Sequence, residues 1–310
     1  MDLIFWVVFC LLIGVFLALD LGVFHKSAHI VPPREALIWT GVWISLAVAF
    51  GVGVFLWQGN EVGIQWFTGY VIEYSLSVDN VFVFALVFAA FAVPRVLQHR
   101  VLFWGVIGAL VMRFVLIALG ASLIESYHWV IYVFGGFLVF TGIRMAFQDA
   151  AHEPHPERNP LVRFARRHMR MVSEFQGQRF FIPTALGRAA TPLLLALIAV
   201  ETTDLLFAVD SIPAIFAVTT DPFIVFTSNA FAILGLRSLY FLLGDAVERF
   251  RYLRLGLAAV LVFVGGKMLL ADIFHLDPMP SLAVILAVLG VSIASSLLAD
   301  RRDRRHAISD

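Results

Sequence analysis

Residues 190–218 read ATPLLLALIAVETTDLLFAVDSIPAIFAV, an apolar run interrupted by the acids Glu201, Asp204 and Asp210. A helix needs about 20 mainly apolar residues to cross a bilayer. An acid at the centre of a span costs roughly 2.5–3.5 kcal/mol, so three acids cost about 7–10 kcal/mol, whereas twenty apolar residues contribute about 6–12 kcal/mol. The run is long enough to span a membrane, but the cost of its acids nearly cancels the contribution of its apolar residues. Its acids must therefore face protein, water or an ion.

The whole chain shares this apolar character. Hydrophobic residues make up 61% of the 310 positions and charged residues 14%, against about 45–50% and about 25% in soluble domains. The formal net charge is zero, so we expect no nucleic-acid partner. The single cysteine, Cys10, cannot form an intrachain disulfide. Since no zinc spacing, paired-cysteine motif or dinucleotide fingerprint is present, we expect neither an enzyme nor a bound cofactor.

Nine apolar runs are long enough to span a bilayer. They predict an all-α polytopic membrane protein with about nine transmembrane helices in one transmembrane domain, residues 1–310. The runs cover roughly residues 3–24, 36–58, 67–93, 101–123, 129–147, 190–218, 223–243, 253–271 and 281–299.

Basic residues occur in alternate connections between these runs. The odd-numbered connections and the C-terminal tail hold 18 of the 22 Lys and Arg, and the even-numbered connections hold none. Basic residues accumulate in cytoplasmic loops, so the alternation predicts an external N-terminus and a cytoplasmic C-terminus. The one long connection, residues 148–189, is then a cytoplasmic loop. Its Arg-rich stretch from Leu161 to Met171 is either a short surface helix on anionic lipid or a solvated linker.

The other four basic residues lie inside predicted spans and reveal an internal repeat. Glu73 precedes Asp79 by six residues, just as Asp204 precedes Asp210. At offsets of 123 to 124 the pairs continue with Arg113 and Arg237, Glu125 and Glu248, and Arg144 and Lys267. The pairing predicts two repeats of three spans each, residues 67–147 and 190–271. An odd number of spans inserts the two copies in opposite directions, as in transporters that bind their substrate near the midplane.

The acids in these spans are the candidate binding site. Carboxylates suit hard divalent cations such as magnesium, calcium or manganese. We therefore expect a divalent cation, as transported ligand, to be bound by Glu73, Asp79, Glu201, Asp204 and Asp210. Supporting roles are expected for the neutral oxygens of Asn80, Ser211 and Asn229, for Arg113 and Arg237 as neutralising charges, and for Asp20 as ligand or gate.

The spacing of the acids also makes a prediction about helix shape. Six residues place Glu73 and Asp79 about 120° apart around an ideal helix. Their span, 67–93, and the span of Asp204 and Asp210, 190–218, are the longest, and Pro213 lies in the latter. We therefore predict that both helices are bent or locally unwound near Asp79 and Asp210, so that freed carbonyls help to coordinate the ion.

Four motifs give the chain a resemblance to the TerC family of bacterial membrane proteins and its Alx branch. They are Leu17-Ala-Leu-Asp20-Leu-Gly-Val-Phe24, Glu73-Tyr-Ser-Leu-Ser-Val-Asp79-Asn80-Val-Phe82, Glu201-Thr-Thr-Asp204-Leu-Leu-Phe-Ala-Val-Asp210-Ser211-Ile-Pro213 and Phe231-Ala-Ile-Leu-Gly-Leu-Arg237-Ser-Leu-Tyr240. The resemblance implies a bacterial inner-membrane protein linked to manganese export. The surplus of acids adds the hypothesis of proton antiport.

Three other interpretations stay open. In the first, the chain is a non-transporting membrane protein that affects the redox state or maturation of exported proteins, as the Alx branch suggests. In the second, it is an anion or amino-acid carrier in which Arg113 and Arg237 bind the substrate. In the third, the acids form structural ion pairs with the intramembrane basic residues and bind no substrate.

Overall fold

The computed structural model describes residues 3–19, 31–147, 159–184, 187–243, 252–273 and 277–309. Ten α-helices and one two-stranded hairpin form within these ranges. Seven of the described helices are long and apolar enough to cross a membrane. The predicted all-α polytopic architecture is therefore confirmed.

The helices occupy every span that the sequence predicts, with one additional short helix. They are α1 (Leu3–Leu19), α2 (Pro33–Gln58), α3 (Asn60–Ala90), α4 (Arg95–Ser126), α5 (Val130–Phe147), α6 (Pro160–His168), α7 (Pro192–Phe216), α8 (Pro222–Leu243), α9 (Leu253–Leu269) and α10 (Pro278–Ser309). The hairpin pairs β1 (Phe181–Thr184) with β2 (Gly187–Ala190). Since α1 and α9 have only 17 described residues each, the number of spans stays a prediction.

Local sequence explains where several helices begin. Five of the described helices start at a proline, namely α2, α6, α7, α8 and α10, because proline lacks the N–H that would stay unpaired in a first turn. Gly59 is the single residue between α2 and α3, and its φ of 93° is one that side chains with a Cβ rarely adopt. Because this turn is so tight, α3 begins at Asn60, seven residues before the predicted boundary.

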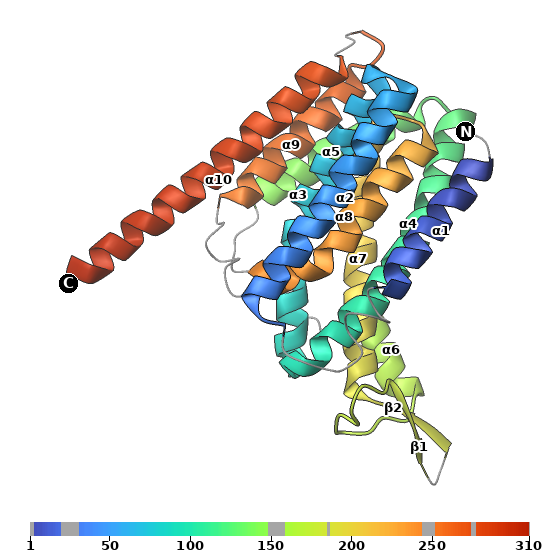
Figure 1. Cartoon of the computed structure of the whole chain (residues 1–310), viewed down its shortest axis with the longest axis vertical. Helices are drawn as coiled ribbons and strands as arrows, with labels where there is room; N and C mark the ends of the chain where they lie inside the picture. Colours follow the sequence, from blue (N-terminus) through green and yellow to red (C-terminus); the bar gives the residue numbers. More distant parts are fainter. Residues whose placement is uncertain are drawn as a thin grey trace.

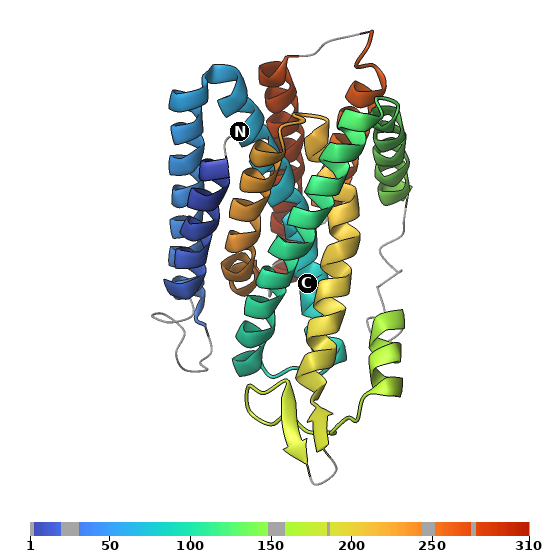
Figure 2. The same ribbon diagram turned by 90° about the vertical axis from the view of Figure 1, so that its right-hand side faces the viewer.

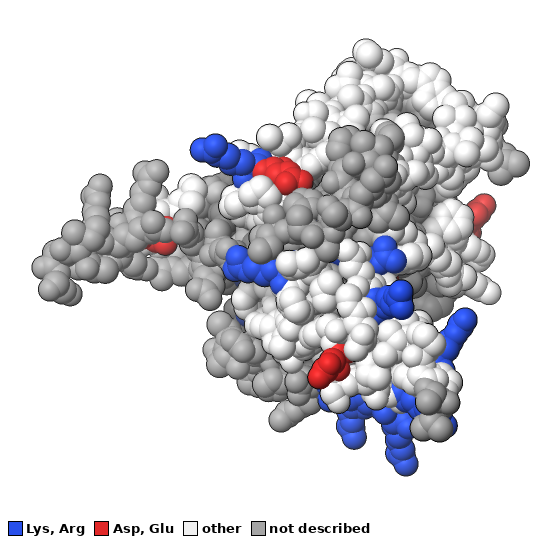
Figure 3. Space-filling view, turned by 60° about the horizontal axis from the view of Figure 1, so that its bottom comes forward, with Lys and Arg blue, Asp and Glu red and all other residues white. Residues whose placement is uncertain are grey.

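The long helices run side by side and alternate in direction, as Figure 1 shows. The hairpin and α6 lie together at one end of the bundle (Figure 2). Figure 3 views this end, where the blue Lys and Arg side chains greatly outnumber the red acids. The helices, the hairpin and the segment between α6 and β1 that meet at this end carry the exposed arginines Arg34, Arg95, Arg163, Arg166, Arg167, Arg170, Arg179 and Arg188. We call it the basic end.

Helix α8 forms the centre of the bundle. All of its residues from Phe223 to Tyr240 are buried, and it packs against α2, α3 and α4. A helix that is apolar nearly all round is suited to such a position. By contrast, α2 and α10 expose most of their apolar residues, as expected of helices that face lipid.

The helix contacts follow a symmetric scheme. Helix α3 packs on α7 and α8, α4 packs on α7 and α8, and α5 packs on α9. Two three-helix repeats related by a two-fold axis would make this set of contacts. The contacts are thus compatible with the predicted repeat, which stays a prediction.

The crossing of α5 and α9 depends on glycine, and two adjacent positions test this. A Cβ at Gly265 would lie 2.7 Å from the Gly135 carbonyl oxygen and 2.8 Å from the Leu138 Cβ, whereas a Cβ at Gly266 would meet nothing within 4 Å. We expect Gly265→Ile to destabilise the protein by about 1–3 kcal/mol, the usual cost of overpacking. Thermal unfolding in detergent would measure the effect, and Gly266→Ile is the matched control. Equal stability of the two variants would contradict this packing.

Candidate functional site

A buried cluster of charged and polar side chains lies between α3, α4, α7 and α8. At its centre is Arg113 of α4, which is 1% exposed. Its Nη1 donates hydrogen bonds to Glu73 Oε1, to Ser211 Oγ at 3.2 Å and to Asn229 Oδ1 at 2.5 Å. Its Nη2 donates to Asp204 Oδ1 at 3.3 Å. One guanidinium therefore connects two buried carboxylates from different helices.

The helical repeat explains which residues reach this cluster. Asn80 follows Glu73 by seven residues, and Ser211 follows Asp204 by seven. Seven residues complete almost two turns, so each pair lies on one helix face. The Asn80 amide lies 3.5 Å from Asp204 Oδ1 and so joins α3 to α7. The predicted supporting residues Asn80, Ser211, Asn229 and Arg113 are all brought together here.

Asp210 lies on a different side of α7. It forms a side-chain hydrogen bond with Thr141 of α5, and the charge of Arg144 is close to it. The reason is that α7 is an unbroken helix through Asp210 and Pro213, so Asp204 and Asp210 point about 120° apart. The predicted local unwinding near the Val-Asp pairs is wrong, since α3 is likewise helical throughout. The alternative, that the helices are bent there, stays a prediction. The structure does not bring Asp210 into the cluster.

Glu201 borders the cluster without belonging to it. It precedes Asp204 by three residues, is half-buried, and lies within electrostatic range of Asp204. Its carboxylate packs against Gly108 of α4, where an added Cβ would overlap the carboxylate oxygens. Nothing in the sequence indicates this role of Gly108, which is one of several glycines in an apolar run.

Several buried oxygens of the site have no hydrogen-bond partner among the described residues. They are Glu73 Oε2, Ser77 Oγ, Asn80 Oδ1, Glu201 Oε2 and Asp204 Oδ2. Buried polar atoms are nearly always paired, so each unpaired one calls for an explanation. Two buried nitrogens of the cluster, Arg113 Nε and Asn229 Nδ2, also have no hydrogen-bond partner among the described residues. The oxygens are the type of donor that hard cations bind.

The cluster also has an excess of formal negative charge. Arg113 pairs with Glu73 and Asp204, and Glu201 lies within electrostatic range of Asp204. The formal charges of these three acids and Arg113 sum to minus two, the charge that a divalent cation would balance. Both nitrogens Nη1 and Nη2 of Arg113 are engaged by the acids of the cluster, so the alternative in which Arg113 binds an anionic substrate stays open only through its Nε.

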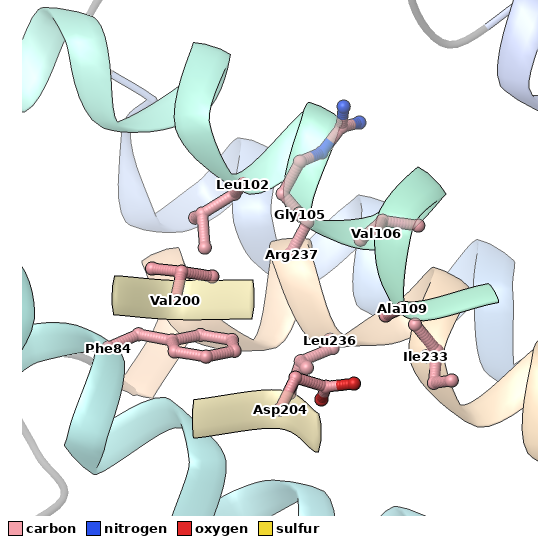
Figure 4. Close-up of a pocket in the computed structure, with 10 residues that line it drawn as sticks. All are labelled: Phe84, Leu102, Gly105, Val106, Ala109, Val200, Asp204, Ile233, Leu236 and Arg237. Atoms are coloured by element: carbon pink, nitrogen blue, oxygen red, sulfur yellow. The ribbon is translucent and has the colours of Figure 1, made fainter. Parts of the chain in front are cut away.

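A cavity of about 10 Å³ adjoins Asp204 on the side toward the basic end. This is about the smallest volume that admits one water molecule. Figure 4 shows its lining, in which Asp204 and Arg237 are the charged residues and the guanidinium of Arg237 points away from the Asp204 carboxylate. Arg237 is thus close to the site and lines the same cavity as Asp204.

The five predicted metal ligands therefore occupy different positions. Glu73 and Asp204 share the cluster, Glu201 borders it, and Asp210 faces α5. The side chain of Asp79 and the whole of Asp20 lie outside the described residues. In the described part of the chain, no three His, Cys, Asp or Glu side chains are grouped as metal ligands would be. The metal role of these residues stays a prediction.

The fold and this cluster define a polytopic helical membrane protein with a charged site shared between its helices. A sequence model described as "Integral membrane protein TerC family" matches residues 58–304. The chain belongs to the TerC family.

Three relatives show how far the similarity extends. A membrane protein of Myxococcus xanthus is 53% identical over 296 residues, which cover 96% of this chain and 92% of the relative. Alx of Escherichia coli strain K12 is 46% identical over 296 residues, covering 92% and 91% of the two chains. Alx of Salmonella typhi is 44% identical over 311 residues, covering 97% and 96%. No solved structure matches the chain.

Proposed function

We propose that this protein transports a divalent cation, manganese first, across the bacterial inner membrane with its basic end in the cytoplasm. One observation carries the proposal: the buried carboxylates of Glu73 and Asp204 and the neighbouring carboxylate of Glu201 each have an oxygen with no hydrogen-bond partner among the described residues. Acids at membrane depth are costly and mark ion pathways. Oxygen donors favour manganese, magnesium or calcium over softer metals. We name manganese first because the resemblance to the TerC family implies a link to manganese export.

In this proposal Arg113 acts as a tethered substitute for the ion. An unpaired carboxylate buried in the membrane is strongly unfavourable, so the empty site needs a positive charge. Arg113 supplies it to Glu73 and Asp204 when no metal is bound. An entering cation competes for the same oxygens and displaces the guanidinium. Because the acids come from both predicted repeats, rocking of one repeat against the other would expose the ion to each side in turn.

Flux measured in proteoliposomes tests the proposal. We expect saturable manganese flux from purified protein, inhibited by competing magnesium or calcium if the selectivity is that of oxygen ligands. Proton antiport predicts that an opposing pH gradient accelerates the flux, and indifference to the gradient would remove the proton step alone. Absence of flux for all three cations, with protein shown to be folded, would refute transport.

A second candidate function rests on the relatives. The Alx proteins carry the words "membrane-bound redox modulator" in their name. This chain has one cysteine, the exposed Cys10, so thiol chemistry would need a second thiol from a partner. If redox modulation were the function, Asp204→Asn would leave cellular manganese unchanged and Cys10→Ser would abolish the redox effect.

A further inference from the structure

Helix α6 presents three different faces. Val162 and Ala165 are buried against α7, in the same apolar cluster as Leu193 and Ala196. Leu161 and Phe164, three residues apart, are 52% and 60% exposed. The remaining surface carries arginines. A short helix that exposes both apolar and basic side chains is suited to the boundary between lipid and water.

The segment that contains α6 is strongly basic. Residues 159–191 include six arginines and a single acid, Glu174, and α6 itself contains no acid. Such a segment next to a membrane is attracted to anionic headgroups by about 1 kcal/mol for each basic side chain. Its charge is therefore complementary to an anionic leaflet.

Arginines of this segment and of α4 lie against aromatic rings. The Arg166 guanidinium lies 5.8 Å from the ring of Phe91, the residue that follows the last turn of α3. Arg100 of α4 similarly lies 5.8 Å from the ring of Trp104 and 6.0 Å from that of Phe180. Tryptophan is enriched where a helix leaves the hydrocarbon, and basic residues gather in the cytoplasmic loops just beyond. These contacts are those expected of a segment at headgroup depth.

Beside Arg166 a groove of about 470 Å³ opens between the end of α3, α6 and the start of α7. Arg166 is the only charged residue in its lining, which otherwise consists of Ser173 and apolar side chains such as Phe91, Met171 and Leu195. One guanidinium above an apolar surface matches a ligand with a charged head and an apolar body. We propose that this groove binds an anionic phospholipid, with Arg166 and Ser173 at the phosphate and the glycerol and upper acyl chain against Phe91 and Leu195.

Lipid retention measured by native mass spectrometry tests this site. Purified protein in detergent would be supplied with phosphatidylglycerol or with phosphatidylcholine. We expect preferential retention of phosphatidylglycerol, reduced about fivefold in Arg166→Gln, the change that corresponds to one basic side chain. Arg166→Lys should keep most of the preference, since it keeps the charge.

Arg188→Gln is the matched control, because Arg188 is an exposed arginine of β2 in the same segment but outside the groove. Equal retention of the two lipids by the unaltered protein would overturn the proposal. So would an Arg188→Gln loss as large as that of Arg166→Gln. If Arg166→Gln left lipid retention unchanged but caused the loss of another protein that copurifies with this one, the lipid proposal would be wrong. The groove would then be assigned to a protein partner. Since the readout is lipid mass, its outcome is independent of whether the protein transports a cation.

Discussion

Replacement of Arg113 by glutamine is expected to lower the stability of the protein by about 3–5 kcal/mol and to abolish its transport. The substitution removes the guanidinium that pairs with the buried carboxylates of Glu73 and Asp204. Breaking a buried ion pair by removing one partner costs about this much, because an uncompensated charge remains. Thermal unfolding in detergent and the yield of monodisperse protein would measure the loss.

A charge-balanced variant separates the electrostatic cause from simple loss of packing. Adding Glu73→Gln and Asp204→Asn to Arg113→Gln removes both carboxylates along with the guanidinium. We expect this triple variant to regain most of the lost stability while remaining inactive, since it keeps the shape of the site but not its charge. Arg163→Gln, on the exposed surface of α6, should change stability by less than about 0.5 kcal/mol. A triple variant as unstable as Arg113→Gln would show that the guanidinium acts by packing.

The positions of the membrane helices could be predicted because apolar runs are a property of the sequence alone. The errors occur where polar residues continue a helix. Asn60 and Glu61 form the first turn of α3, and Gln98 to Arg100 belong to α4, although hydropathy starts both predicted spans after them. The hairpin of Phe181–Ala190 was not predicted, since its four-residue strands lack a repeating apolar pattern.

The candidate site could be predicted only in part. The candidate acids of the site could be identified from the sequence, because charged residues are rare in an apolar run that crosses a membrane. Which of them meet depends on how helices face one another. The seven-residue spacing of Glu73 and Asn80 was readable from the sequence, and so was the 120° offset of Asp210 from Asp204. Because α7 is a regular helix, Asp210 keeps this offset from Asp204 and stays outside the cluster. Pro213 lies in the last turn of α7 and does not interrupt the helix.

Asp204→Asn is expected to reduce manganese flux at least about 100-fold while leaving the protein folded. The substitution removes one negative charge and an unpaired oxygen from the site, and the loss should exceed the 10–100-fold that follows when only an outer partner of a metal ligand is removed. Glu73 still balances Arg113 in the variant. The fold is therefore expected to survive, as thermal unfolding can show.

The comparison of flux with stability is what distinguishes a transport site from a structural ion pair. Glu125→Gln removes an exposed acid from α4 and should leave flux within about twofold, since exposed charges contribute little. A structural ion pair predicts the reverse pattern for Asp204→Asn: lower stability and, for the protein that remains folded, flux close to normal. Because the amide of asparagine can still accept the hydrogen bond from Arg113 Nη2, loss of flux in a stable Asp204→Asn protein would be due to the missing charge.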